Sequence, residues 1–497
     1  MRKLTALLML GALMILAFPQ SDTTLEYTVT RLTDNEDRDH EPQINDNNDV
    51  VWMGFDGNDY EIYMYEWLID WVWQITDNSY DDRNPKINNN GDIAWQGRDG
   101  SEYQIFFYEN DRDTIWEISS SDPGSHYNAM EPDLNDEGDI VWEEYNGSVY
   151  NIFLYKNSTG DIFQLTTDIG VNNYNPRIND NGDVTWFRHY SDSILTFYDY
   201  YYVMVYDDFT NSIFDVWRQL IPFVEDLSDI DDVEPKINNN SQIAWSAYDS
   251  SFIADEIYYY DVIASEFIQI TDNDYYDLFP DINSEGDVTW LSLDSDADWD
   301  EILLYRRDTG DIEQITNTAE EGYWGPTMPQ ISDIGYVTFL ATEARLVGWN
   351  LEVYVYDGSQ IWNISGSDDN EYFPRINSIG NVVWAADVDA DDDEIFLATL
   401  PEEEDGEENG DGGGSSLDCF IATACFGTPM ADEVKILRLF RDRYLMKNPA
   451  GREFIRLYNK FGPKAADFIR NKEPLKKIIR YCLRSFVWAI KTIGVIS

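Results

Sequence analysis

Two short runs of the sequence place an aspartate at every second position. They consist of Asp294, Asp296, Asp298 and Asp300, and of Asp387, Asp389, Asp391 and Asp393. Alternating carboxylates on a flexible segment are typical of calcium loops, because this hard cation takes about six to eight oxygen ligands. Neither run has the glycine and glutamate positions of an EF-hand, so a solvated turn is the alternative interpretation. Calcium is the one cofactor that these residues suggest.

Other residue types that support catalysis are scattered. The three histidines, His40, His126 and His189, lie far apart without metal-ligand spacing, and no Gly-x-Ser-x-Gly motif is present. The 95 acidic residues offer many accidental carboxylate pairs, so their abundance does not identify an acid–base pair. We therefore predict no catalytic residue and a protein that is not an enzyme. An exported, carboxylate-based glycosidase is the alternative.

One phrase recurs eight times along the chain, for example as PKINNNGDIAW at 85–95 and PRINDNGDVTW at 176–186. The copies begin at Pro42, Pro85, Pro132, Pro176, Pro235, Pro280, Pro329 and Pro374. Ten residues after these prolines stand Trp52, Trp95, Trp142, Trp186, Trp245, Trp290, Phe339 and Trp384. Because Asn, Asp and Gly form tight turns between the two apolar segments, each copy predicts a β-hairpin that ends on a large aromatic residue. We expect these aromatic residues to pack between neighbouring sheets.

Each hairpin is followed by an aromatic segment such as EIYMY at 61–65 and by a short strand such as WQITD at 73–77, FQLTT at 163–167 or IQITD at 268–272. Four strands in each repeat of 43 to 59 residues predict the blades of a β-propeller. Residues 27–34 match a fourth strand without its blade, and residues 393–400 match a third strand without its partner. We expect the first segment to pair with the last sheet and close an eight-bladed ring.

Charge divides the 497-residue chain into two parts. Its net charge is −62, yet residues 417–497 hold 16 basic and 7 acidic residues, against 17 and 88 in the remainder. Residues 401–416 have no apolar side chain to bury and predict a flexible acidic linker. Residues 1–21 have the basic start and short apolar run of a signal peptide, and residues 22–400 contain the propeller.

The acidic side chains gather in two kinds of connection. In a four-stranded blade, the second-to-third and fourth-to-first connections lie on one face of the disc, and the acidic segments 33–42, 76–85, 225–235, 271–280, 294–301 and 387–394 belong to them. A negative face attracts cations or basic protein segments and repels nucleic acid. We expect an envelope or extracellular protein, or a basic peptide, as the partner, and no nucleic acid.

The repeat resembles the WD40-like, TolB-type propeller repeat, in which a Leu-Thr-Asp strand end leads through a loop to a strand that starts with proline. The matching residues are Leu32, Thr33 and Asp34 in the first copy and Ile270, Thr271 and Asp272 in the sixth. The resemblance covers roughly residues 27–400. It implies the propeller fold and suggests protein–protein binding in the cell envelope. Eight copies exceed the usual blade number of that family, so no particular partner is implied.

The C-terminal region, residues 417–497, resembles the CFI-box C-terminal domain of bacterial exported proteins. The match is carried by Cys419, Phe420, Ile421, Ala422, Thr423, Ala424 and Gly427, and it implies a sorting or surface-anchoring module. The residues themselves predict helices, and the last helix has an apolar face beside basic residues. That face fits either the core of the small domain or an anionic membrane surface. Cys419 is a candidate for processing or for a disulfide with Cys425, and a buried cysteine is the alternative.

These observations predict an all-β, eight-bladed propeller that is closed by its N-terminal strand, followed by a small α-helical C-terminal domain. The function that they favour is an exported, non-catalytic protein-binding or scaffold propeller. It would act in the bacterial periplasm, at the cell surface or outside the cell, where the C-terminal module places it.

Overall fold

The computed structural model describes residues 27–35, 37–98, 100, 102–119, 128–192, 198–222, 234–248, 254–294, 299–318, 323–344, 349–389 and 392–401. These residues belong to the first of two compact units, Met1–Glu402. The second unit, Glu403–Ser497, lies outside the described residues, and so does the predicted signal peptide. In the described part, no helix has the length and apolar character needed to cross a membrane.

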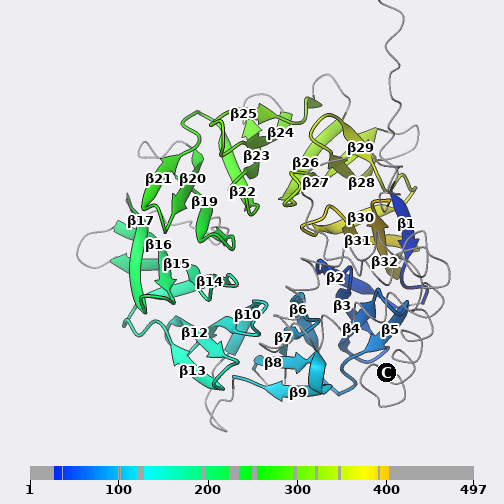
Figure 1. Cartoon of the computed structure of the whole chain (residues 1–497), viewed down its shortest axis with the longest axis horizontal. Coiled ribbons are helices and arrows are strands. Elements are labelled where there is room, and N and C mark those ends of the chain that lie inside the picture. Colours follow the sequence, from blue (N-terminus) through cyan, green and yellow to red (C-terminus); the bar gives the residue numbers. More distant parts are fainter. Residues whose placement is uncertain are drawn as a thin grey trace, which may run out of the picture. The chain divides into compact units, whose positions relative to one another are not determined.

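The described strands form eight four-stranded antiparallel sheets, arranged around a centre as the blades of a propeller (Figure 1). The inner strands are β2 (Asp39–Ile44), β6 (Asp82–Ile87), β10 (Asn128–Leu134), β14 (Asn172–Ile178), β18 (Lys236–Ile237), β22 (Tyr276–Ile282), β26 (Tyr323–Ile331) and β30 (Asn370–Ile376). The second strands are β3 (Val50–Phe55), β7 (Ile93–Gly97), β11 (Ile140–Tyr145), β15 (Val184–Asp192), β19 (Gln242–Tyr248), β23 (Val288–Asp294), β27 (Val337–Ala344) and β31 (Val382–Asp389).

The third strands are β4 (Tyr60–Glu66), β8 (Gln104–Glu109), β12 (Tyr150–Lys156), β16 (Tyr198–Asp207), β20 (Asp255–Asp261), β24 (Trp299–Tyr305), β28 (Trp349–Tyr356) and β32 (Asp392–Thr399). The outer strands are β5 (Trp71–Gln74), β9 (Thr114–Glu117), β13 (Asp161–Gln164), β17 (Ser212–Pro222), β21 (Glu266–Gln269), β25 (Ile312–Gln314), β29 (Ile361–Asn363) and β1 (Thr28–Arg31). A single 3-10 turn, η1 (Asn110–Arg112), joins β8 to β9. Blades are numbered below from the blade that begins with β2.

The N-terminal strand closes the ring, as the sequence predicts. β1 pairs antiparallel with β32, from Thr28 opposite Thr399 to Arg31 opposite Phe396, and completes the sheet of β30, β31 and β32. Beyond the strand, the hydroxyl of Thr33 accepts a hydrogen bond from the backbone N–H of Ile395 at 2.9 Å. Both ends of the propeller are thereby fixed in one blade, which leaves no unpaired edge between the first and the last sheet.

The outer strands are shorter than the sequence pattern predicts. A strand is expected over 73–77, 163–167 and 268–272, but β5, β13 and β21 end at Gln74, Gln164 and Gln269. In each case the following threonine turns inward and its hydroxyl accepts the backbone N–H of an isoleucine in the third strand. The side chain thus replaces the backbone as hydrogen-bond acceptor, and the strand ends three residues before its predicted end.

The recurrent aromatic residues lie in the core between sheets, which confirms their predicted packing role. All eight are at most 1% exposed. Trp52, for example, stacks on Tyr63 of its own sheet and packs against Val383 and Ile395 of the last blade. Burial of such large side chains removes much apolar surface from water and is the main favourable contribution that each blade offers.

The asparagine three residues after each proline links neighbouring blades. In seven blades its side-chain amide donates to the backbone carbonyl of the corresponding residue in the next blade, with N···O distances between 2.7 and 3.2 Å. The eighth position is Ser332, whose hydroxyl instead donates to Tyr336 of its own turn. The repeated phrase therefore builds the hairpin and also ties it to the next one.

Buried acids accept the indole N–H of several core tryptophans. Asp39, Asp82 and Asp277 accept from Trp52, Trp95 and Trp290 at 2.9 to 3.0 Å. Burial raises the pKa of Asp39 and of Asp82 to about 7. In blade 4 the same bond is accepted by Asn173, which shows that an amide also fits this position.

Candidate functional site in the central channel

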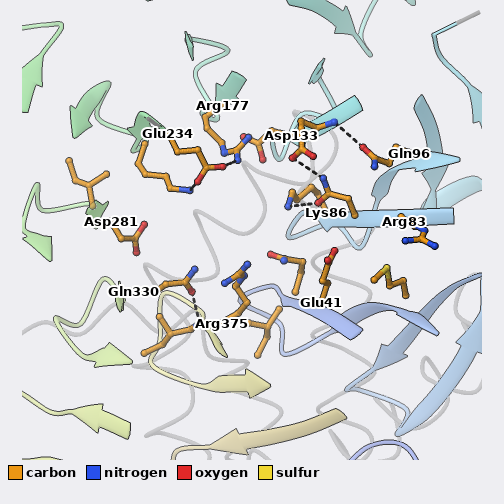
Figure 2. A pocket seen from close by; sticks show the side chains of 18 of the residues that line it. Glu41, Arg83, Lys86, Gln96, Asp133, Arg177, Glu234, Asp281, Gln330 and Arg375 are labelled. Atoms are coloured by element: carbon orange, nitrogen blue, oxygen red, sulfur yellow. Dashed lines mark hydrogen bonds and ion pairs between the residues drawn. The ribbon is translucent and has the colours of Figure 1, made fainter. Parts of the chain in front are cut away.

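A polar cavity of 740 Å³ occupies the centre of the ring (Figure 2). Its wall includes the residue that directly follows the repeat proline in each of the eight inner strands, β2 to β30 in chain order. These eight residues, called the channel ring, are Gln43, Lys86, Asp133, Arg177, Lys236, Asp281, Gln330 and Arg375. All are polar, and four are cations. The wall also contains Arg83 and the acids Glu41, Glu131 and Glu234, so cations and acids line the cavity in equal number although the chain as a whole is strongly acidic.

The prolines explain why these side chains reach the channel. The inner strand is an edge strand, and proline is tolerated there because it has no N–H to donate to a neighbour. The residue before the proline has a left-handed backbone in Glu41, Asn84 and Glu131, with φ of 51 to 53°. At these places the pairing with the second strand shifts register, as in a β-bulge. The unpaired residues are the proline and the residue before it, and the pairing resumes at the residue after the proline, where Gln43, Lys86 and Asp133 lie opposite Val51, Ala94 and Val141.

Three members of the channel ring hold neighbouring blades together. The carboxylates of Asp133 and Asp281 accept the backbone N–H groups of Ile178 and Ile331 at 2.9 and 2.8 Å. Gln330 accepts from Ile376 in the same way at 3.3 Å. Each bond runs from one inner strand to the next. Burial raises the pKa of Asp281, and the hydrogen bond from Ile331 opposes this rise.

Two ring cations share one glutamate. Arg177 forms an ion pair with Glu234, and the ammonium of Lys236 lies 2.6 Å from the other carboxylate oxygen. The Arg177 guanidinium, followed by Lys236, lowers the pKa of Glu234 below its ordinary value, so this carboxylate stays ionised. These two cations therefore have their counter-charge within the wall of the cavity.

The other two ring cations, Lys86 and Arg375, have no carboxylate in ion-pair distance within the described part of the chain. Lys86 donates to the side chain of Asn84 at 2.9 Å, and Arg375 donates to the carbonyl of Pro374 at 3.2 Å. Both extend into the cavity from different sides (Figure 2). Burial among the inner strands, and then the nearby Arg177, lowers the pKa of Lys86 to about 8, and burial also lowers the pKa of Arg375. Acids of the cavity wall act in the opposite direction, Glu131 and Asp133 on Lys86 and Glu234, Asp281 and Glu41 on Arg375. Lys86 and Arg375 are thus the two ring cations that form no ion pair in a wall of mixed charge.

The connections around the channel divide between two faces, as the sequence predicts. The turn into β4 contacts the connection between blades 1 and 2, because Tyr60 N–H donates to Asp81 at 3.2 Å. The turn between β4 and β5 instead contacts the hairpin turn of β2 and β3, where Trp67 N–H donates to Asp49 at 3.0 Å. Second-to-third and fourth-to-first connections thus share one face, here called the loop face.

The aspartate runs proposed as calcium ligands are only partly described. Asp387 and Asp393 lie opposite each other in β31 and β32, and Asp393 contacts His40 at 3.2 Å. Asp300 lies in β24, and Asp294 and Asp389 lie in β23 and β31, although the side chains of the latter two are not described. Asp296, Asp298, Asp391, Cys419 and Cys425 fall outside the described residues. Calcium binding by these runs stays a prediction.

The channel ring was missed by the sequence reasoning, although a signal for it exists. The position after the repeat proline is polar in all eight copies, yet its residue type changes from blade to blade. Four of the 17 basic residues before residue 417 stand at this one position. This position is polar and variable, and it lies between the repeat proline and an apolar residue on the innermost strand. Such a pattern indicates a ligand surface rather than a core position.

Comparisons with known proteins concern the fold. No protein-family model matches the chain, and no curated protein sequence matches it. Oligogalacturonate lyase from Vibrio parahaemolyticus is 11% identical with a TM-score of 0.47, over 78% of this chain and 96% of that chain. The β-propeller domain of the Trilobed protease from Pyrococcus furiosus is 12% identical with a TM-score of 0.45, over 67% and 99%. Porphyromonas gingivalis dipeptidyl peptidase 4 is 10% identical with a TM-score of 0.47, over 69% and 57%. The shared feature is the propeller, and no activity of those proteins transfers to this chain.

Proposed function

We propose that this chain is an exported, non-catalytic binding propeller that holds a carboxylate of a basic peptide or protein segment in its central channel. The observation that carries the proposal is the pair of channel cations Lys86 and Arg375, which line the cavity without an acidic partner among the described residues. A guanidinium group binds a carboxylate through two parallel hydrogen bonds, and an ammonium adds a point charge. Together they form a suitable receptor for one carboxylate.

The loop face favours a basic partner. The chain carries 95 acidic residues, and the acidic connections lie on the same face as the strand starts that lead into the channel. Such a field draws Lys and Arg side chains to the surface and speeds association. A segment with basic residues near a free C-terminal carboxylate would place its basic side chains on the acidic loop face and its carboxylate beside the channel cations.

The setting of this function rests on the sequence. The predicted signal peptide at 1–21 supports export, and the basic module at 417–497 supports placement at the cell envelope or surface, in part through a membrane surface. The linker at 401–416 would let the propeller move relative to that module.

The test compares two forms of one arginine-rich peptide, with a free C-terminus and with an amidated C-terminus, in titrations against the full chain. A charge-assisted hydrogen bond contributes about 1.5–3 kcal/mol, so amidation should weaken binding by roughly tenfold or more. Arg375→Gln should weaken the free-acid peptide to a similar extent and leave the amidated peptide unchanged. Lys236→Gln is the matched control, because it removes a ring cation that already pairs with Glu234.

Two results would contradict the proposal. The first is equal affinity for both peptide forms, which would place the peptide on the loop face alone. The second is turnover of a polysaccharide that one carboxylate substitution abolishes, which would support the exported glycosidase instead.

A further inference from the structure

The turn that leads into the third strand of blade 1 gathers three acids. Asp56, Asp59 and Glu61 each bring a carboxylate oxygen within 4.8 Å of the other two. The turn is tight: Asp56 N–H donates to the carbonyl of Asp59 at 3.1 Å, and Gly57 takes a φ of 98° that favours glycine. The side chain of Asp56 also accepts the N–H groups of Asn58 and Asp59.

Two of these acids are buried, and one of them, Asp59, lacks any hydrogen-bond partner. Asp59 is 8% exposed, and neither of its carboxylate oxygens has a partner. Glu61 is fully buried; one oxygen accepts the N–H of Asn78 at 2.7 Å, and the other has no partner. Burying a carboxylate without hydrogen bonds or a counter-charge is costly.

The charges that act on Asp59 come from Asp56, Asp81 and Asp77, and all are negative. Burial raises the pKa of Asp59, and these neighbours raise it further. Asp59 in turn raises the pKa of Glu61 after the larger effect of burial. The turn therefore concentrates negative charge that the described residues around it do not neutralise.

Blade 3 shows that the same turn folds without any of these acids. There Asn146, Val149 and Asn151 stand at the positions of Asp56, Asp59 and Glu61. The turn hydrogen bond from Asn146 N–H to the carbonyl of Val149 is again 3.1 Å. Val149 is 7% exposed, so its position is an apolar one. The acids of blade 1 are consequently not required by the turn, and their presence needs another explanation.

We infer that Asp56, Asp59 and Glu61 bind a calcium ion. Two oxygens bound to one calcium at about 2.4 Å lie at most about 4.8 Å apart, which matches the spread of this cluster. The ion would use the oxygens that lack protein partners, and water would complete its coordination. Because Glu61 also accepts from Asn78, the ion would fix the turn against the connection between blades 1 and 2. This site differs from the aspartate runs at 294–300 and 387–393, and it is independent of the proposed function.

The test is a calorimetric titration of the full chain with calcium chloride after treatment with a chelator. We expect wild type to bind calcium and Asp59→Asn to bind it at least roughly tenfold more weakly, since one of three charged ligands is lost. Asp272→Asn is the matched control, because it removes an exposed acid from the connection between blades 5 and 6, on the same face. It should retain the affinity of wild type.

Thermal unfolding separates ligand loss from misfolding. In chelator, Asp59→Asn should unfold at a higher temperature than wild type, since it removes an unpaired buried charge. In excess calcium the order should reverse, because the ion stabilises only wild type. Absence of calcium binding by wild type, equal binding by Asp59→Asn, or loss of binding in Asp272→Asn alone would each overturn the assignment.

Discussion

Blades 1 and 8 carry the same acidic sequence pattern at the start of their third strands, but only blade 8 contains counter-charges. In blade 8, Glu394 pairs with Arg31 at 2.7 Å, and Asp393 contacts His40 at 3.2 Å. In blade 1, Glu61 and Asp59 have no cation in ion-pair distance among the described residues. In blades 5, 6 and 7 the equivalent residues Glu256, Glu301 and Glu352 instead accept hydrogen bonds from the connection that follows the outer strand. Asp59 of blade 1 has neither a cation nor a hydrogen bond within the described part of the chain, and we infer that a metal ion takes their place.

The cation of blade 8 comes from the strand that closes the ring. Arg31 lies opposite Phe396 in β32, and the corresponding outer-strand residues of the other blades are Gln74, Glu117, Gln164, Asp215, Gln269, Gln314 and Asn363. None of these residues is a cation. The N-terminal strand is thus the one outer strand with a cation at this position, and that cation pairs with the sheet that the strand completes.

The same comparison identifies the channel site. Arg177 and Lys236 have Glu234 as an internal partner, whereas Lys86 and Arg375 do not have one among the described residues. A cation that forms an ion pair in one blade and none in another marks a candidate position for ligand binding.

Removal of the closing charge should have the largest effect. Arg31→Gln makes blade 8 resemble blade 1, because it leaves the fully buried Glu394 without its cation. Breaking a buried pair from one side costs about 3–5 kcal/mol, and the partial exposure of Arg31 reduces this to roughly 2–3 kcal/mol. Urea unfolding of the variant measures the loss. An unchanged free energy of unfolding would mean that the closing strand holds by its backbone alone.

The junction between blades 1 and 2 should make stability depend on pH. Burial raises the pKa of Asp82 to about 7, so the folded protein holds this proton more tightly than the unfolded chain. The stabilisation that comes from protonated Asp82 is complete below the pKa of this residue in the unfolded chain, near 3.8. It is lost as the pH rises through the folded pKa of about 7. Stability should therefore rise on acidification from about pH 8 to about pH 5.

Asp82→Asn should reduce that pH dependence by on the order of 1–3 kcal/mol, because the amide does not titrate. Asn173, which accepts the indole N–H in blade 4, indicates that the amide fits. Urea unfolding at several pH values gives the slope of the free energy of unfolding against pH. If the slope is the same in wild type and variant, Asp82 is not the group that titrates.

A cation placed in blade 1 should imitate blade 8. Gln74 occupies the position of Arg31, so Gln74→Arg brings a guanidinium toward Glu61. In chelator we expect a gain of about 1 kcal/mol in the free energy of unfolding. Calorimetry should also show weaker calcium binding, because the new cation repels the ion. Gln164→Arg in blade 3, which has Asn151 at the position of Glu61, is the control and should change neither quantity.

The smallest effect concerns the pH dependence of peptide binding. Lys86 has a pKa near 8, so it loses its charge as the pH rises through that value, and affinity for the free-acid peptide should fall by roughly threefold to tenfold. Lys86→Arg should give a flat profile, since arginine stays charged. Fluorescence titration of the arginine-rich peptide at several pH values distinguishes the two. A fall in affinity that persists in Lys86→Arg would exclude Lys86 as its cause.

The fold was predictable because its signals repeat with fixed offsets. Pro85 and Trp95 stand ten residues apart, as in every copy, and a hairpin is the structure that this spacing allows. The stray strand at 27–34 predicted the closure for the same reason. The sites were not predictable in this way, because they consist of positions where one blade differs from its neighbours.

Asp59 illustrates this limit. In the sequence it belongs to an ordinary Asp-Gly-Asn-Asp turn, whereas in the structure it is buried and the charges of Asp77 and Asp81 in the next connection act on it. Only the contrast with Val149 reveals that an apolar position holds a charge. The aspartate runs at 294–300 and 387–393 are the more conspicuous calcium candidates in the sequence, because their acids are closely spaced. In the structure, however, Asp393 contacts His40.

The most direct test of the central claim is a crystal structure of the full chain with the free-acid, arginine-rich peptide. We expect the terminal carboxylate to lie in the cavity, in contact with the Arg375 guanidinium and the Lys86 ammonium. The peptide arginines should lie on the loop face. A peptide bound with its carboxylate in solvent, and no ligand atom within contact distance of Lys86 or Arg375, would contradict the claim.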